Sequence, residues 1–187
     1  MIASMWWNLT RASANVAWVL VLATILWGVL LTTRVMRGLD RPAWLLDLHR
    51  WMGGLTILFS VVHMASLIAD SYVEFTPVSV LIPFTSDYRS WEVSLGVLGF
   101  WLLVLIQGTS LMKKHLSQKT WRGIHMVSYP LYAIIVVHAL TAGSDVGTPL
   151  YAGFSTALAM TGAAVAGTRW VAGRAVSRRP RPDVAAS

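Results

Sequence analysis

Five long apolar segments constrain the fold of this chain more than any other feature of its sequence. Each is near or above the roughly 20 residues that a helix needs to cross the hydrocarbon core of a bilayer. An open strand in lipid would leave its backbone N–H and C=O groups unpaired, so such segments are expected to be helices. They cover approximately residues 15–33, 44–69, 91–112, 121–142 and 149–171. We therefore predict an all-α membrane protein, a five-helix transmembrane bundle whose domain occupies residues 1–172.

The composition supports this fold class. Hydrophobic residues make up 56% of the chain and charged residues 12%, against about 25% charged residues in a typical soluble domain. The net charge of +7 would suit nucleic acid, but in so apolar a chain we interpret the basic residues as anchors against membrane lipid and expect no nucleic-acid partner. The chain has no cysteine, which excludes disulfides, thiolate zinc sites, thiolate-held iron–sulfur clusters and haem attached through cysteine.

The charged residues are distributed unequally between the two ends of the predicted helices. All but two of the 15 basic residues fall at one end, and the exceptions are Arg11 and Arg89. By the positive-inside rule, the N-terminus lies outside and the C-terminus in the cytoplasm. We predict a multi-pass protein of the bacterial plasma membrane, with residues 173–187 as a basic, disordered cytoplasmic tail. The acidic residues near the opposite, outer end are Asp70, Glu74, Asp87, Glu92 and Asp145.

Four of the five histidines lie in two pairs within the apolar segments. His49 and His63 are 14 residues apart in the second segment, and His125 and His138 are 13 residues apart in the fourth. Both segments run in the same direction, so the pairs define two levels about 20 Å apart, each with one imidazole from each helix. Ionisable groups inside a membrane are costly and usually functional. Two neutral imidazoles on either side of a flat metal complex are the ligands of bis-histidine haem, and we expect the second ring nitrogen of each to bond a backbone carbonyl one turn back.

Helical phase supports this pairing only in part. Fourteen residues bring His49 and His63 to within about 40° of one face, whereas thirteen leave His125 and His138 about 140° apart. Pro130 lies between the latter two and is expected to kink the helix, which would change that angle. A non-redox protein that conducts protons or binds another metal is the alternative, although zinc would require three or four ligands at one level.

Three stretches of the sequence resemble the ferric reductase-like transmembrane family, which includes NADPH oxidases, ferric reductases and the haem-binding subunit of bacterial methionine sulfoxide reductase systems. The stretches are LHRWMGGLTILFSVVH, PFTSDYRSWEVSLGVLGFWLLVLIQGTSLMKK and WRGIHMVSYPLYAIIVVHALTAGSD, within residues 44–145. The resemblance implies two haem b groups stacked across the membrane. It implies His49 and His125 as ligands of the inner haem iron, and His63 and His138 as ligands of the outer one. The implied activity is electron transfer outward across the membrane, as a component of an oxidoreductase.

The resemblance also directs attention to residues and partners around the haems. Haem propionates are anionic and favour arginine or lysine. Arg50, Arg122 and Lys119 are placed for the inner haem and Arg89 for the outer one, whereas no catalytic residue is assigned. Larger family members carry flavin and nicotinamide domains after the last helix, but no G-x-G-x-x-G pattern follows a strand in this sequence. We therefore expect electrons from a separate cytoplasmic flavin reductase with FMN or FAD, or from a membrane quinol.

The acceptor on the outer side is expected to be ferric iron, oxygen or a partner reductase. In the alternative interpretation, the chain is the haem-binding membrane subunit of a two-component reductase of the methionine sulfoxide reductase type. The connection between the second and third segments contains the apolar run VSVLIPF. This run is too short to span a membrane and is expected to lie at the outer interface and to cap a feature beneath it.

Overall fold

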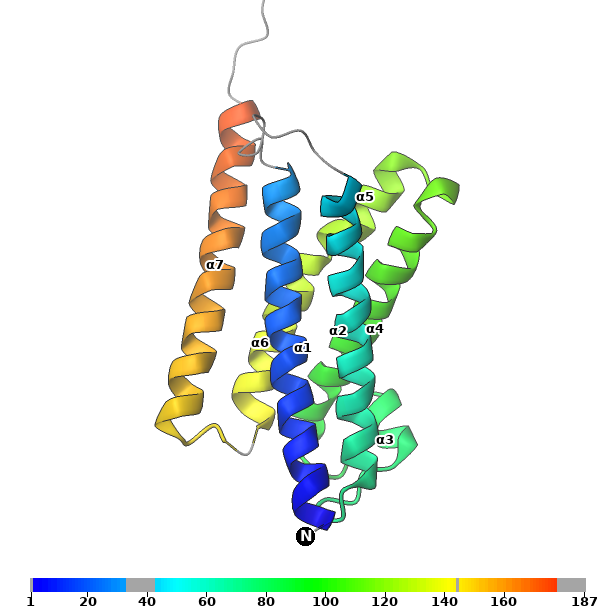
Figure 1. Ribbon diagram of the computed structural model, residues 1–187, viewed down its shortest axis with the longest axis vertical. Coiled ribbons are helices and arrows are strands. Elements are labelled where there is room, and N and C mark those ends of the chain that lie inside the picture. Colours follow the sequence, from blue (N-terminus) through cyan, green and yellow to red (C-terminus); the bar gives the residue numbers. More distant parts are fainter. Residues whose placement is uncertain (1, 33–42, 144, 178–187) are drawn as a thin grey trace, which may run out of the picture.

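The computed structural model describes residues 2–32, 43–143 and 145–177. These residues contain helices and no strand (Figure 1). In chain order the helices are α1 (Ile2–Thr32), α2 (Ala43–Ala69), α3 (Pro77–Leu81), α4 (Ser90–Leu111), the short 3-10 helix η2 (Lys113–His115), α5 (Gln118–Met126), α6 (Ser128–Ala142) and α7 (Pro149–Ser177).

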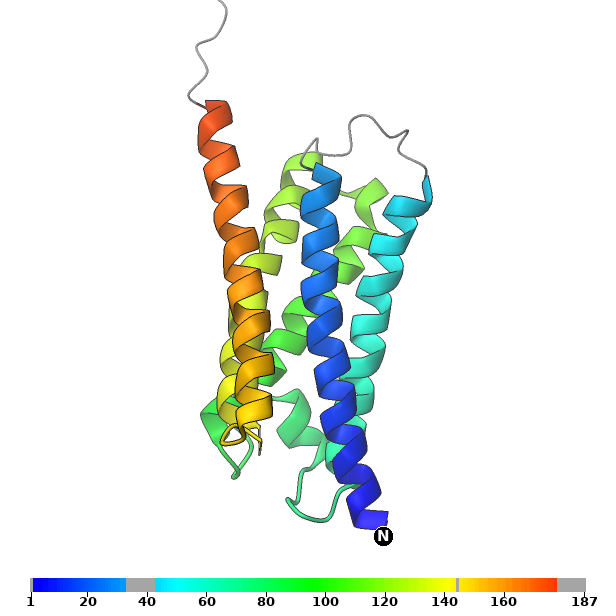
Figure 2. The same ribbon diagram turned by 60° about the vertical axis from the view of Figure 1, so that its left-hand side comes forward.

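Five spans in the described part of the chain are long and apolar enough to cross a membrane: α1, α2, α4, α5 together with α6, and α7. They run alternately up and down, so the N-terminal end of α1 and the C-terminal end of α7 lie at opposite ends of the bundle (Figures 1 and 2). Large apolar side chains such as Trp51, Leu58 and Met160 are exposed, as expected for surfaces that face lipid. The prediction of an all-α, five-helix, multi-pass membrane protein is confirmed. The outward placement of the N-terminus stays a prediction.

The first helix is longer than predicted. α1 begins at Ile2 rather than near residue 15, because no proline or glycine interrupts its more polar first half. That half also packs on α2, where the Thr10 hydroxyl donates a hydrogen bond to the Ser66 hydroxyl (2.8 Å). The extra turns bring the Thr10 region against the C-terminal half of α2.

The last helix also exceeds its predicted limit. α7 continues to Ser177 instead of ending at residue 171, so residues 173–177 are helical and the prediction of a disordered tail is wrong for them. Alanine and arginine favour helix, and the first proline after the span is Pro180. Residues 178–187 lie outside the described part of the chain.

The fourth predicted helix, residues 121–142, is divided in two. α5 ends at Met126, and α6 begins after a turn at Val127. Pro130 explains the break, because it has no N–H to donate to the Met126 carbonyl and its ring collides with that carbonyl in a regular helix. At the break, the Val127 N–H bonds the Ile124 carbonyl three residues back (3.0 Å). This spacing is tighter than the four residues of a regular α-helix. With this change of winding, His125 and His138 both face the interior of the bundle, where each lines a cavity.

The buried apolar core lies where α1, α6 and α7 meet. Trp18, Val21, Leu22 and Tyr132 form its centre, and the Tyr132 hydroxyl donates to the Leu158 carbonyl of α7 (2.7 Å). α1 packs along α2, and α4 packs along α6, while α7 stands at one side of the bundle (Figure 2). The interior between α1, α2, α4 and α6 is therefore left for the histidines.

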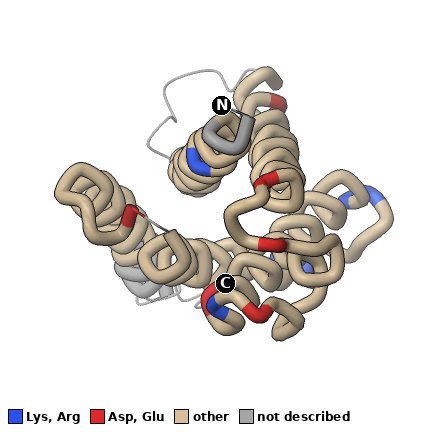
Figure 3. Tube along the Cα trace, turned by 90° about the horizontal axis from the view of Figure 1, so that it is seen from below, with Lys and Arg blue, Asp and Glu red and all other residues tan. Residues whose placement is uncertain are grey.

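Charge separates along the bundle axis, as predicted. Figure 3 views the molecule from the end at which the N-terminus lies, where acidic residues are prominent. Asp70, Glu74, Asp87, Glu92 and Asp145 belong to the connections and helix ends on this side. The described basic residues of the opposite end include Arg50, Lys113, Lys114, Lys119 and Arg122. Arg34, Arg37 and Arg41, which are also among the 13 basic residues predicted at that end, lie outside the described residues.

Candidate cofactor site

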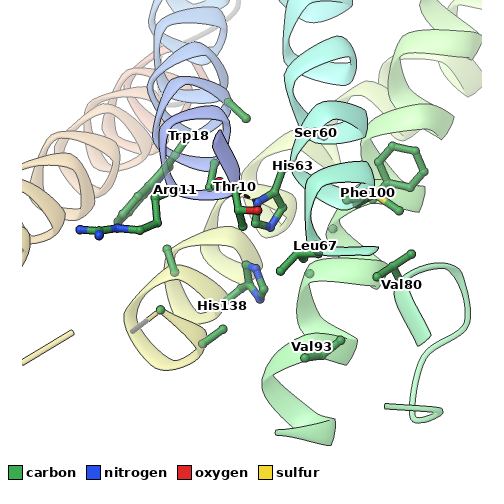
Figure 4. Close-up of a pocket in the computed structure, with 18 of the residues that line it drawn as sticks. Thr10, Arg11, Trp18, Ser60, His63, Leu67, Val80, Val93, Phe100 and His138 are labelled. Atoms are coloured by element: carbon green, nitrogen blue, oxygen red, sulfur yellow. Dashed lines mark hydrogen bonds between the residues drawn. The ribbon is translucent and has the colours of Figure 1, made fainter. Parts of the chain in front are cut away.

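A cavity of about 420 Å³ lies between α1, α2, α4 and α6, near the N-terminal end of α1 (Figure 4). His63 of α2 and His138 of α6 both line this larger cavity. The connection between α2 and α4 closes its end, and Phe75, Val80 and Tyr88 are among the lining residues. The apolar run of this connection contributes Val80 to the closure, so the connection caps the cavity, in line with the role that the sequence predicted for it.

The two imidazoles of the larger cavity are each held by a backbone carbonyl. His63 Nδ1 lies 3.0 Å from the Thr10 carbonyl of α1, and His138 Nδ1 lies 2.7 Å from the Glu92 carbonyl of α4. A carbonyl can only accept, so in both rings Nδ1 carries the proton and donates, and Nε2 keeps its lone pair. This is the tautomer that ligates a metal through Nε2. The expected carbonyl partners are present, but the prediction that they belong to the preceding turn of the same helix is wrong.

Gly96 allows the His138 ring to lie directly on the backbone of α4. A Cβ atom at Gly96 would lie 2.6 Å from Cε1 of His138, so any side chain there would displace the imidazole. On the other side of the cavity, the Ser66 hydroxyl bonds both Thr10 and the His63 carbonyl. Small and hydroxyl-bearing residues thus fix both rings by close approach of the helices.

Two arginines lie at the rim of the larger cavity. Arg11 forms an ion pair with Asp145 in the connection between α6 and α7, and Arg89 donates to the Thr141 carbonyl at the end of α6 (2.5 Å). Arg89 has a left-handed backbone (φ 42°), a conformation that is uncommon and strained for most residues other than glycine. The sequence indicated Arg89 but missed Arg11, although both carry the same signal of a basic residue at the acidic end.

A second, smaller cavity of about 130 Å³ lies toward the opposite end of the bundle. His49 of α2 and His125 at the end of α5 both line it, with their ring centres 6.0 Å apart and their planes at 62°. Gly28 of α1 lies against the His49 ring, where a Cβ atom would come within 3.1 Å of Cε1. Both predicted histidine pairs are therefore brought together, each pair in its own cavity.

The imidazoles of the smaller cavity are held less firmly. His125 Nδ1 reaches the Ser110 hydroxyl at 3.4 Å. His49 Nδ1 is buried and faces the Thr24 backbone, but it has no hydrogen bond of good geometry to any described residue. Within the described part of the chain, neither ring therefore has the short carbonyl bond seen in the larger cavity.

The structure separates the basic residues that the sequence proposed for the inner haem. Arg50 lines the smaller cavity and bonds Asp47 (3.1 Å). Arg122 and Lys119 are exposed and are not among the described residues that line it. Of these three candidates, only Arg50 is at the cavity.

Each cavity is lined by two histidine imidazoles, one from α2 and one from α5 or α6. In the described residues, no group of three or more His, Cys, Asp or Glu side chains could hold a metal ion. In the larger cavity the Nε2 atoms are unprotonated, and glycines lie against one ring in each cavity. Paired imidazoles of this kind fit haem, whose iron is held by histidine in many proteins.

Comparison with known proteins identifies the family of the chain. Among the curated proteins and the solved structures, none matches this chain significantly. The family model described as ferric reductase like transmembrane component matches residues 12–136, more than half of the chain. The matched region contains His49, His63 and His125, and His138 follows two residues after it. The chain therefore belongs to the ferric reductase-like transmembrane family, whose general role is electron transfer across membranes.

Proposed function

We propose that this protein is a diheme b-type cytochrome that carries electrons outward across the membrane. In this proposal, His63 and His138 ligate the outer haem in the larger cavity, and His49 and His125 ligate the inner haem in the smaller one. The observation that carries it is the pair of Nδ1 bonds to backbone carbonyls (3.0 and 2.7 Å). These bonds leave two unprotonated Nε2 atoms, on different helices, at one cavity.

Haem, when bound, supplies an iron that accepts and releases one electron. The residues of the chain hold it and set its surroundings. The Thr10 and Glu92 carbonyls fix the tautomer of the two outer imidazoles and increase their basicity. Arg89 at the larger cavity and Arg50 at the smaller one offer guanidinium groups to carboxylates.

The two cavities share an apolar wall. Val21, Leu103 and Leu131 line both of them, so the residues common to the two cavities are aliphatic side chains from α1, α4 and α6. This shared wall offers no hydrogen-bonding group to water or ions. It suits the transfer of electrons from one level to the other without a parallel path for protons.

The electron donor and the electron acceptor complete the proposal. We propose a separate cytoplasmic flavin reductase or a membrane quinol as donor, and ferric iron, oxygen or an outer-side reductase as acceptor. The basic end, with exposed Lys113, Lys114 and Lys119, favours a donor with an acidic surface. A role as the haem-binding subunit of a two-component reductase requires the same two haems and differs in its outer partner.

The decisive experiment is a haem count. Protein purified in detergent from haem-replete cells should contain close to two haem b per chain by the pyridine haemochrome assay. His63→Ala or His138→Ala should reduce this to about one, because each removes a residue that would hold the outer haem. His115→Ala is the matched control, since His115 is exposed in η2 and lines neither cavity. A folded, haem-free preparation would overturn the proposal.

A further inference from the structure

The surroundings of His125 differ from those of the other three paired histidines. Its hydrogen bond to Ser110 is long (3.4 Å), but the Trp121 ring stacks on its imidazole, with ring centres 5.0 Å apart and planes at 22°. Trp121 and His125 are four residues apart on α5, so they lie on the same face of the helix. The orientation of this imidazole is therefore set by ring stacking more than by a hydrogen bond.

Trp121 is in turn contacted by a lysine. The Lys113 Nζ atom lies 4.1 Å from the centre of the Trp121 ring, well within the range of a cation–π interaction. Trp121 Nε1 is buried without a hydrogen-bond partner among the described residues, whereas a buried tryptophan N–H usually has one. Ring contacts therefore hold this side chain between Lys113 and His125.

We propose that Trp121 is a positioning residue for His125 and that Lys113 adjusts the reduction potential of the inner site through this stack. The inference rests on the proposed function, in which His125 is an axial ligand of the inner haem. A positive charge near a redox centre stabilises its reduced state, which carries less positive charge. Lys113 therefore raises the midpoint potential of the inner haem. Because Lys113 stands in the exposed η2 turn, the stack connects the basic surface of the bundle with its interior.

Lys114 provides a matched control. It carries the same charge at the adjacent position and is exposed, but the cation–π contact with the Trp121 ring belongs to Lys113. Any general effect of removing one positive charge from this turn should therefore be the same for both lysines. A difference in midpoint potential between the two variants therefore measures the effect of the contact between Lys113 and Trp121.

The test is a redox titration of the purified, haem-loaded protein, combined with EPR spectra of the oxidised state. It is made in a His63→Ala background, which is expected to keep only the inner haem. Lys113→Gln should lower the inner midpoint potential, and Lys114→Gln should lower it distinctly less. Trp121→Leu should alter the low-spin EPR signal, which depends on the angle between the ligand rings, and should remove the effect of Lys113→Gln. Trp121→Phe keeps an aromatic ring and should restore the wild-type signal.

Two results would overturn the inference and leave the diheme function intact. One is an equal shift from Lys113→Gln and Lys114→Gln, and the other is an unchanged EPR signal and potential in Trp121→Leu. The lysine pair keeps the test decisive where Trp121→Leu does not fold. A wild-type protein without haem would instead contradict the proposed function.

Discussion

Both cavities are lined by two histidines, but the imidazoles of the larger cavity are held more firmly than those of the smaller one. The larger one encloses about 420 Å³, has both Nδ1 atoms on backbone carbonyls and is capped by the connection between α2 and α4. The smaller one encloses about 130 Å³, and neither of its Nδ1 atoms has a short carbonyl bond to a described residue. Ligands that are already oriented lose less freedom on binding. If the two cavities hold haem as proposed, the larger one should bind it more rigidly and be more sensitive to changes in packing.

The difference has its origin in the neighbouring helices. In the larger cavity, α1 and α4 approach closely enough to present the Thr10 and Glu92 carbonyls to the rings. In the smaller cavity the second ligand stands on α5, which the break at Val127 separates from α6. No described neighbouring helix presents a carbonyl at short distance to either ring there, and His125 stacks on Trp121 instead.

The largest effect is expected from Gly96→Ala. The new methyl group would lie 2.6 Å from His138 Cε1, so the ring would have to leave its place against α4. We expect the outer haem to be lost and the haem count to fall from two per chain toward one. Gly54→Ala is the control, since a Cβ atom at Gly54 would have no described atom of another residue within 4 Å beyond its own helical turn, and alanine favours helix by about 1 kcal/mol. Two haems and an unchanged spectrum in Gly96→Ala would show that the His138 ring is not held rigidly against Gly96.

Gly28→Ala should have a smaller effect at the other level. Its methyl group would lie 3.1 Å from His49 Cε1, a contact that a displacement of a few tenths of an ångström relieves. We expect the inner haem to remain, with an altered EPR signal and faster transfer to apomyoglobin, while the outer haem is unchanged. If Gly28→Ala impairs haem binding as strongly as Gly96→Ala, the smaller cavity is as rigid as the larger one and the comparison is wrong.

The smallest effect is expected from Arg11→Gln. The ion pair with Asp145 is partly exposed, with 43% of the Arg11 side chain accessible, so its loss should cost about 1 kcal/mol or less. We expect roughly fivefold faster loss of the outer haem at most, and no change in the inner one. A double-mutant cycle with Asp145→Asn measures the coupling between the two side chains. Strictly additive effects would show that the pair does not act as a unit at the rim.

Much of this protein could be predicted from local patterns. The five spans follow from the lengths of the apolar segments, and α2 and α4 agree with their predicted limits to within one residue. The predicted helix limits are wrong where polar residues extend a helix, as in α1 and α7. The first half of α1 contains Arg11, which is tolerated there because it faces the rim of a cavity. An apolar-length rule cannot detect that, since it treats every polar residue as exposed to lipid.

The sequence by itself determined that the chain crosses a membrane as helices and that four histidines stand at two levels, because apolar length and residue spacing are properties of single segments. Only the tertiary structure decided what surrounds those histidines. The carbonyls that fix His63 and His138 lie 53 and 46 residues away in the chain. The rings that pack against Gly96 and Gly28 also belong to other helices, and they approach the two glycines to different distances. Such contacts depend on how closely and at which rotation the helices pack. No periodicity within one segment contains that information.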